Sequence, residues 1–293
     1  MPSPHRSVLL EETIQLLDVA PGMRILDCTL GWGGHSERLL ETGATVVGID
    51  RDPDAIEAST LRLAGYGERF RAIRARFSTS LHRLDEPVDG LVADLGVSSP
   101  QLDRGERGFS FRYDAPLDMR MGRDGRTAAE LIEDSDVSSL ARILRSYGEE
   151  NQALRIAKAI KKMGPSTTGE LAQLVEDLLG RRGRIHPATK TFQALRIAVN
   201  DEMGELEALL GVLPELLRSG GRAAIISFHS LEDRMVKQRF RELSGIGTEK
   251  DPYGNPVEPP LGRLVTRKPV TSSDDNPRAR SARLRVWEKR SPR

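Results

Sequence analysis

Short apolar segments that alternate with helical patterns constrain the fold of this chain most strongly. Three of them, at residues 24–27, 45–50 and 88–94, are apolar or β-branched runs that end in aspartate. Helical patterns follow the first two, at 36–41 and 54–58. Strands that alternate with helices are typical of a parallel sheet. The pattern therefore predicts an α/β fold with a doubly wound sheet.

The spacing of the later segments predicts an insertion. A weaker third strand is expected at 70–73, and a fifth at 222–228 after a leucine-rich helix at 206–213. The first four strands fit within about 95 residues, whereas more than 120 residues separate the fourth from the fifth. An ordinary crossover connection is far shorter. The chain between these strands must therefore form a structure of its own.

Helical periodicity fills the inserted stretch. Apolar residues recur at i, i+3, i+4 and i+7 in two places, at Ala153, Ile156, Ala157 and Ile160 and at Leu171, Leu174, Val175 and Leu178. Thr167 and Glu170 have the spacing of a capping box that opens the second helix. We therefore expect a helical domain at 106–203, inserted into a sheet domain made of 1–105 and 204–293.

The segment from residue 261 onward has two distinctive features. Short β-like runs at 264–266 and 284–287 predict a terminal antiparallel hairpin. The segment 261–293 also carries ten Lys and Arg residues against three Asp and Glu, the strongest local excess of positive charge. Four of these arginines are close together, at Arg278, Arg280, Arg283 and Arg285. They predict a basic footprint of the kind that binds nucleic acid.

Composition bounds the cellular setting. The formal net charge is only +1, so overall charge does not identify a nucleic-acid-binding protein. Cys28 is the single cysteine, which excludes an internal disulfide framework and a cysteine-based zinc site. Glu11 and Glu12 interrupt the first apolar stretch, and no later apolar run approaches ~18 residues. We therefore expect a cytoplasmic protein without a membrane partner, with Cys28 as a small packing residue.

A glycine-rich loop follows the first strand. Gly31, Gly33 and Gly34 allow the backbone to turn sharply and let a ligand approach closely. A tight strand-to-helix turn without a ligand would have the same glycines. Asp50 ends the next strand, where an acid can accept both ribose hydroxyls of an adenosine-bearing cofactor. The combination favours a cofactor that contains adenosine, either a nicotinamide dinucleotide or S-adenosylmethionine (AdoMet).

The identity of the loop residues favours AdoMet over a dinucleotide. The loop lacks the third glycine of the dinucleotide fingerprint, and the bulky residues Trp32 and His35 stand where a pyrophosphate needs close approach. Asp27 begins the loop, which suits a ligand that carries a cationic amine and a sulfonium. No Gly-Lys-Ser/Thr follows, which disfavours a phosphate-binding P-loop.

The turn after the fourth strand is the expected acceptor side. Asp94 ends that strand, and ligands in open α/β sheets sit at such strand ends. Asp94, Ser98 and Ser99 offer oxygens that could orient an exocyclic amine and assist its proton loss. In the alternative interpretation, Asp94 caps a turn and the two serines solvate it.

Two further clusters could contact RNA. Arginines alternate with aromatic residues at 104–113, as in a surface that combines charge with base stacking. Arg155, Lys158 and Lys162 form one face of the first inserted helix. Helix faces that are simply exposed to solvent have the same composition, so both an RNA contact and an ordinary solvated face stay open for this helix.

Other motifs do not support a distinct chemistry. Segment 227–233 holds the residue types of a hydrolase triad, but no nucleophile elbow is present, so we do not expect hydrolysis. His5, His82 and His186 are isolated, and we interpret them as surface or capping groups. No metal site is therefore predicted.

Taken together, these segments closely resemble the bacterial 16S ribosomal RNA cytidine N4-methyltransferase family (RsmH/MraW). The resemblance runs from His5 to about Arg285. Its ten motifs are His5 with SVLLEE (7–12), GGHS (33–36), IDRDP (49–53), DLGVSSPQLD (94–103), RGFSF (107–111), PLDMRM (116–121), YGEE (147–150), HPAT (186–189), ISFHSLED (226–233) and NPRARS (276–281).

The resemblance implies a Rossmann-like AdoMet methyltransferase sheet with a helical substrate-recognition insert. It implies methylation of the N4 amine of a cytidine in the decoding region of small-subunit RNA, within the ribosomal subunit. The cofactor contacts that it implies are Gly33, Gly34, His35, Asp50 at the ribose, Phe77 near the adenine, Asp94 and Gln101. In place of the Asp/Asn-Pro-Pro-aromatic motif of other base-amine methyltransferases, this chain has Asp94-Leu95-Gly96-Val97, so the catalytic role of Asp94 is inferred and not matched.

We therefore expect in-line methyl transfer to a flipped-out cytosine, with Asp94 or an oxygen of Ser98 or Ser99 accepting the amine hydrogen. Two rival functions stay open: methylation of another amine, on DNA or protein, and an RNA-binding assembly factor with a vestigial AdoMet pocket. The oligomeric state, monomer or homodimer, is not determined by the sequence.

Overall fold

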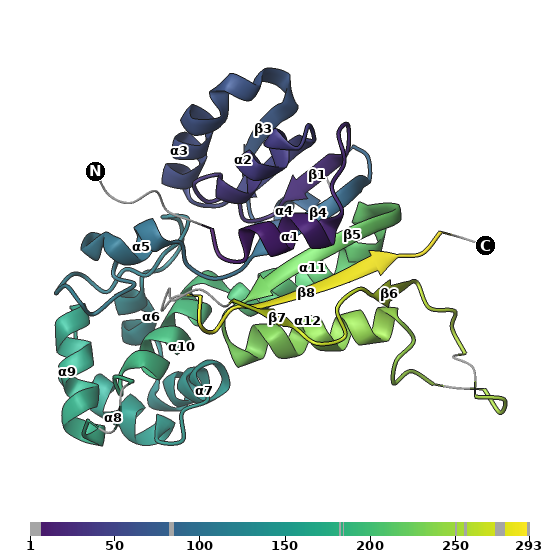
Figure 1. The fold of residues 1–293 in the computed structure, drawn as a ribbon. Coiled ribbons are helices and arrows are strands. Elements are labelled where there is room, and N and C mark those ends of the chain that lie inside the picture. Colours follow the sequence, from purple (N-terminus) through teal and green to yellow (C-terminus); the bar gives the residue numbers. More distant parts are fainter. Residues whose placement is uncertain are drawn as a thin grey trace. The chain divides into compact units, whose positions relative to one another are not determined.

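The structure is a computed structural model that divides into two compact units. The first unit comprises Met1–Gly96 and Gly204–Arg293, and the second is Val97–Met203. Figure 1 traces the chain through both units. The described residues are 7–81, 85–181, 183, 185–249, 251–254, 257–272 and 279–291.

The first unit is built on one mixed sheet with the strand order β3-β2-β1-β4-β5-β8-β6, and β7 also pairs with β8. Strands β1 to β5 are parallel, and β8 runs antiparallel to β5. The predicted doubly wound sheet is thus confirmed. The strands are β1 (Arg24–Asp27), β2 (Thr45–Asp50), β3 (Phe70–Arg74), β4 (Val88–Asp94), β5 (Leu217–Ser227), β6 (Gly262–Leu264), β7 (Val270–Thr271) and β8 (Arg283–Lys289).

Helices cover both faces of this sheet, with α1 and α12 on opposite sides in Figure 1. They bury a core to which Ile25, Leu39 and Val286 belong, all nearly inaccessible to solvent. The helices assigned to this unit are α1 (Leu10–Leu17), α2 (Gly34–Glu41), α3 (Pro53–Leu63), α4 (Phe77–Ser80), α11 (Glu202–Leu216, beginning at the end of the second unit) and α12 (Ser230–Leu243), with a 3-10 helix at Ala64–Arg69. None of the described helices is both long and apolar enough to span a membrane.

The predicted terminal hairpin is confirmed, since β6 and β8 pair in antiparallel register. β8 also pairs with β5 along residues 222–227, so the end of the chain extends the main sheet. β8 buries Leu284 and Val286 against the core, and Arg285 and Trp287 on its other face are buried as well.

The second unit is helical. Its helices are α5 (Ser99–Asp103), α6 (Ala128–Asp134), α7 (Val137–Gly148), α8 (Ala153–Met163), α9 (Thr168–Leu179) and α10 (Thr189–Asn200), with a 3-10 helix at Gly105–Arg107. The predicted capping box opens α9: the Thr167 side chain accepts from the backbone of Glu170, and the Glu170 side chain accepts in return. The unit starts at Val97 and not at residue 106, because Val97 and Leu102 pack against its core.

Candidate active site

Three carboxylates end neighbouring strands of the first unit. Asp50, Asp27 and Asp94 are the last residues of β2, β1 and β4, which are adjacent in the sheet. The three strands are parallel, so their carboxyl ends lie at the same edge of the sheet. Ligands of open α/β sheets bind at this edge. The structure therefore brings together the three acids that the sequence singled out.

The glycine-rich loop is held between β1 and the start of α2. The Gly31 N–H donates to Asp50 Oδ2 at 2.8 Å. Gly33 has φ of 80°, a left-handed conformation that favours glycine, and it is the N-cap of α2. A Cβ at Gly34 would clash with Ser7 Oγ, so a side chain there would require the Ser7 side chain to move. Gly33 thus has a conformational reason and Gly34 a steric one.

Asp27 lies at the bottom of the site and is only 1% exposed. It accepts hydrogen bonds from the Ser36 hydroxyl at 2.7 Å and from the Thr29 N–H at 3.1 Å. The pKa of Asp27 is raised to about 6, mainly by burial and to a smaller extent by the charge of Asp50, while the two hydrogen bonds oppose the shift. A cation bound nearby would favour the ionised carboxylate.

Asp94 and His35 face each other at the same edge. Asp94 Oδ2 lies 3.8 Å from His35 Nδ1. Burial raises the pKa of Asp94 well above its usual range, and the charges of Asp27 and Glu232 add to the shift. Burial also lowers the pKa of His35 to about 4, so this imidazole is neutral at pH 7 and does not compensate Asp94. Asp94 Oδ1 and His35 Nε2 are buried and have no hydrogen-bond partner among the described residues.

Phe77 opens α4, the short helix that follows β3. The backbone N–H of Ala75 donates to the Asp50 carbonyl at 2.9 Å, which ties this turn to the end of β2. Ser78 donates its N–H and its hydroxyl to the two carboxylate oxygens of the buried Glu205, at 3.0 and 2.8 Å. The residue next to the half-buried Phe77 is therefore held by α11.

Ser98 and Gln101 belong to the second unit, where they form a reciprocal capping box at α5. The Ser98 N–H donates to Gln101 Oε1 at 3.0 Å, and the Gln101 N–H donates to Ser98 Oγ at 3.4 Å. This structural role does not test the catalytic role of Ser98 or the cofactor contact of Gln101. Both stay predictions.

The expected stacking surface at 104–113 is only partly present, because Arg104, Arg112 and Tyr113 are exposed whereas the centre of the segment is packed. Arg107 is buried, and its guanidinium donates to the carbonyls of Arg120 and Met121 at 3.0 and 2.9 Å. Phe109 belongs to the helical core, and Phe111 packs edge-on against Phe192 with centroids 4.9 Å apart. Arg107, Phe109 and Phe111 of this segment therefore pack within the second unit.

The basic footprint expected in the tail is also partly wrong. Arg285 is 8% exposed and donates to Asp233 at 2.7 and 3.2 Å. Arg283 donates to the same carboxylate at 2.8 Å. Arg280 is exposed, and Arg278 lies outside the described residues. The two arginines of β8 therefore fix α12 to the sheet.

The remaining polar motifs have local roles. His229 is the N-cap of α12 and forms a capping box with Glu232. The ring of His186 lies 3.1 Å from a Glu176 oxygen and accepts from the Ala188 N–H, as expected of a capping group. Cys28 is buried beside Asp27, and burial raises the pKa of its thiol. Burial and a thiol that resists ionisation are consistent with the predicted packing role. His5 and His82 lie outside the described residues.

Sequence reasoning missed three residues of the site. Thr29 Oγ1 accepts from the Asp94 N–H at 2.5 Å, and Ser36 donates to Asp27. Both hydroxyls stand in or beside the glycine-rich loop, so a search for donors near Asp27 could have found them. Glu205 gave no signal, because its partner Ser78 is 127 residues away.

Comparisons with known proteins identify the family that this chain resembles. The model of the MraW methylase family matches residues 2–290. The chain is 54% identical to a protein named ribosomal RNA small subunit methyltransferase H from Myxococcus xanthus, and the match covers 97% of both chains. Proteins of the same name from Anaeromyxobacter (53% identity, 97% of both chains) and Caulobacter vibrioides (45%, 98% of both) are also similar.

Proposed function

The chain belongs to the MraW methylase family, and on that basis we propose that it methylates the N4 amine of a cytidine in the decoding region of 16S ribosomal RNA. The relatives named above are small-subunit ribosomal RNA methyltransferases, which supports RNA as the acceptor. The choice of a cytidine, and of its N4 amine as the methylated atom, is inferred from the motifs that define the resemblance. The structural observation that carries the proposal is the group of three acids at adjacent strand ends.

The described residues fit AdoMet as the cofactor. Asp94 Oδ1 is a buried acceptor without a partner among them, and Asp27 and Asp94 resist ionisation in the absence of a cation. AdoMet supplies an electrophilic methyl group on a cationic sulfonium. The residues proposed to hold it are Gly33, Gly34, His35, Asp50, Phe77, Asp94 and Gln101.

Asp94 is the proposed acceptor for the amine hydrogen. Burial disfavours the ionised form of Asp94, a bound cationic sulfonium would favour it, and only that form can accept a proton. Asp94 also stands at the strand end where the acceptor must enter. The Thr29 hydroxyl accepts a hydrogen bond from the backbone N–H of Asp94 and so holds its backbone. The His35 ring lies 3.8 Å from Asp94 Oδ2, on one side of the Asp94 carboxylate. Ser98, four positions later, is the alternative acceptor.

The first experiment compares Asp94→Asn with the unchanged protein in transfer of labelled methyl to small ribosomal subunits. At saturating AdoMet, kcat should fall by about 10²–10⁴-fold, the usual contribution of a general base. Ser98→Ala is the matched comparison, and it should retain most of the rate. If Asp94→Asn keeps near-normal kcat while Ser98→Ala loses it, the proton acceptor is Ser98.

A second experiment separates the proposed substrate from its rivals. Labelled AdoMet is supplied with small subunits, naked 16S RNA, DNA and protein, and the product is mapped by mass spectrometry. We expect a single N4-methylcytidine in the decoding region, with the intact small subunit as the preferred substrate. We propose that the reaction takes place in the cytoplasm. Label on DNA or protein would support another amine acceptor, and no label at all would support an assembly factor. Sedimentation of the same preparation distinguishes a monomer from a homodimer.

A further inference from the structure

Helices α7 and α8 of the second unit carry a set of cations that the proposed mechanism does not use. Arg142 and Arg145 lie on α7, and Arg155, Lys158 and Lys162 lie on α8. All five side chains are exposed. Their spacings are i, i+3 on α7 and i, i+3, i+7 on α8, so the cations of each helix share one face. The two helices pack against each other (Figure 1), and we call these five residues the insert cations.

Charge is segregated among the helices of the second unit. α7 and α8 contain no Asp or Glu, whereas α6 and α9 contain acids and no Lys or Arg. The unit as a whole is almost neutral, with 17 Lys and Arg against 16 Asp and Glu. Exposed helix faces commonly carry both signs, because opposite charges at i and i+4 stabilise a helix. The basic character is therefore a local property of α7 and α8.

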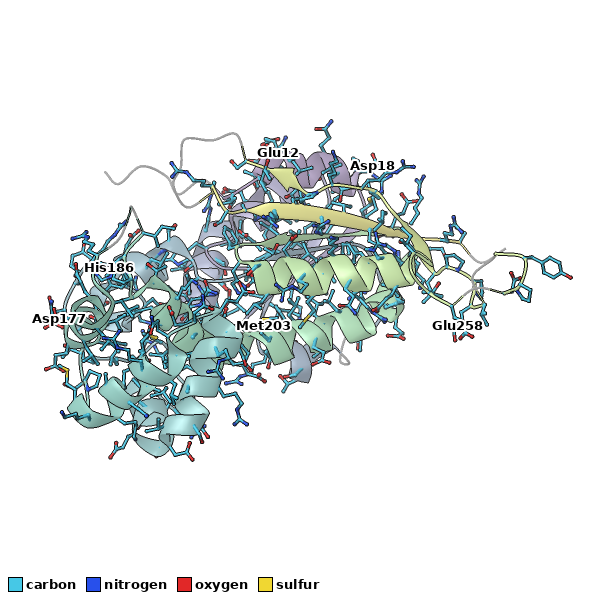
Figure 2. The ribbon with its side chains drawn as sticks, turned by 90° about the horizontal axis from the view of Figure 1, so that it is seen from below. Glu12, Asp18, Asp177, His186, Met203 and Glu258 are labelled. Carbon is cyan, nitrogen blue, oxygen red and sulfur yellow. The ribbon has the colours of Figure 1, made fainter. Side chains whose placement is uncertain are left out.

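The acids of the neighbouring helices do not pair with the insert cations. Glu130 of α6 and Glu170 of α9 belong to the capping boxes of their own helices. Asp177 of α9, which Figure 2 labels, accepts from Gln173 at 2.7 Å. Within the part of the chain that the structure describes, no hydrogen bond or ion pair joins an insert cation to another side chain. The five positive charges thus face solvent without a carboxylate partner among the described residues.

Other cations of the same unit do have structural partners. Lys161, the remaining cation of α8, is half-buried and donates to two carbonyls at the end of α6, both at 2.9 Å. Arg120 pairs with Asp118 at 2.7 Å, and Arg196 pairs with Glu202 at 2.7 Å. These contacts give each of the three cations a role in the fold. The described residues offer the insert cations no such role, so their charge is available to a ligand.

We propose that the insert cations bind phosphates of the substrate RNA outside the target nucleotide. The inference rests on the proposed RNA substrate, and it assigns one surface of the second unit to that substrate. Lys and Arg side chains that are free of carboxylate partners are suited to contact the phosphate backbone. Two rows on neighbouring helices allow several such contacts at once, and none of them reads a base. The insert cations therefore contribute affinity and positioning, and not the choice of the methylated base.

The test measures binding of naked 16S RNA to the full chain as a function of salt concentration. Each phosphate contact on a single strand contributes about 0.7 to the slope of log K against log [salt]. The triple variant R155A/K158A/K162A should therefore reduce the slope by about 2, and the double variant R142A/R145A by about 1.4. AdoMet binding by calorimetry should not change, because none of the five residues belongs to the proposed cofactor site. Circular dichroism should show unchanged helix content, because alanine is well accepted at exposed helix positions.

The double variant R71A/R290A is the matched control, because it removes the same net charge as R142A/R145A. Arg71 and Arg290 are exposed residues of the first unit. Arg71 lies near the start of β3 and Arg290 follows the end of the antiparallel β8, so both lie toward the edge of the sheet opposite Asp94. This control should leave the slope unchanged. It separates a local phosphate contact from a general effect of net charge.

Three results would overturn the inference alone. They are unchanged slopes in both insert variants with normal methylation of small subunits, an equal fall of the slope in the control, and loss of poly-glutamate binding without loss of RNA binding. The last result would assign the surface to an acidic protein. Absence of RNA binding by the unchanged protein would overturn the proposed function and this inference with it, and that result is seen before any variant is compared.

Discussion

At the residue scale, Asp27 carries a free-energy cost in the folded protein. Its pKa rises from 3.8 to about 6 because burial disfavours the carboxylate. Between these two values the folded chain binds the proton more tightly than the unfolded chain does, so stability decreases as pH rises through this window. Above it the cost is constant, at about 3 kcal/mol for about two pKa units. A bound cation would offset this cost by favouring the ionised carboxylate, so the buried Asp27 suits a site that binds a cation.

Asp27→Asn tests this cost in the protein without cofactor. The amide removes the charge and can still accept from Ser36 or Thr29, so we expect the free energy of unfolding at pH 8 to rise by up to about 3 kcal/mol. The gain should vanish near pH 4. Urea unfolding from pH 4 to 8 measures it, and AdoMet affinity should fall in the same variant. A destabilised variant at pH 8 would contradict the proposed origin of the raised pKa.

At the element scale, α4 depends on a single distant carboxylate. Ser78 donates two hydrogen bonds to Glu205 of α11, and Phe77 stands beside it. Glu205 is 7% exposed, so water replaces these bonds poorly. The position of Phe77 is therefore coupled to the start of α11.

Glu205→Gln keeps the size of the side chain but leaves only one acceptor oxygen. A lost hydrogen bond to a charged group costs about 1.5–3 kcal/mol, so KM for AdoMet should rise about tenfold or more, with a smaller effect on kcat. Ser78→Ala, which removes only the hydroxyl bond, should have an intermediate effect. Equal falls in kcat for both variants, without a change in KM, would argue against anchoring of Phe77.

At the scale of the whole molecule, the second unit is continuous in sequence and has its own core. Leu140, Leu144 and Ile156 are fully buried there, and buried Asn200 donates to the Met119 carbonyl at 2.7 Å. All described residues of this core lie within the second unit. The unit therefore has the properties of an independent domain.

We predict that a fragment of residues 97–203 folds alone. It should give a helical circular dichroism spectrum and a cooperative thermal transition, and it should not bind AdoMet. Leu140→Asp is the control, because a buried charge in this core should abolish the transition. A fragment with the spectrum of a random coil would mean that the second unit needs the sheet unit to fold.

Much of the fold could be predicted because its signals are local. The bounds of β1, β2 and β4 match the apolar runs that end in Asp27, Asp50 and Asp94. Thr167 and Glu170 form the predicted capping box because both partners lie within one turn. The compact helical unit begins at Val97 and not at the predicted residue 106, and the packing of Val97 against the helical core has no signature at its own position in the sequence.

The sequence by itself determined the strand ends, the loop and the insert, because strand and helix periodicity and turn chemistry act over a few residues. Only the tertiary structure decided which charges reach solvent. Arg285 and Asp233 pair across 52 residues, whereas Lys237 on the same helix as Asp233 stays exposed. Desolvation and pairing depend on neighbours that are distant in the chain, so the exposure of each charged side chain is decided only by the folded structure.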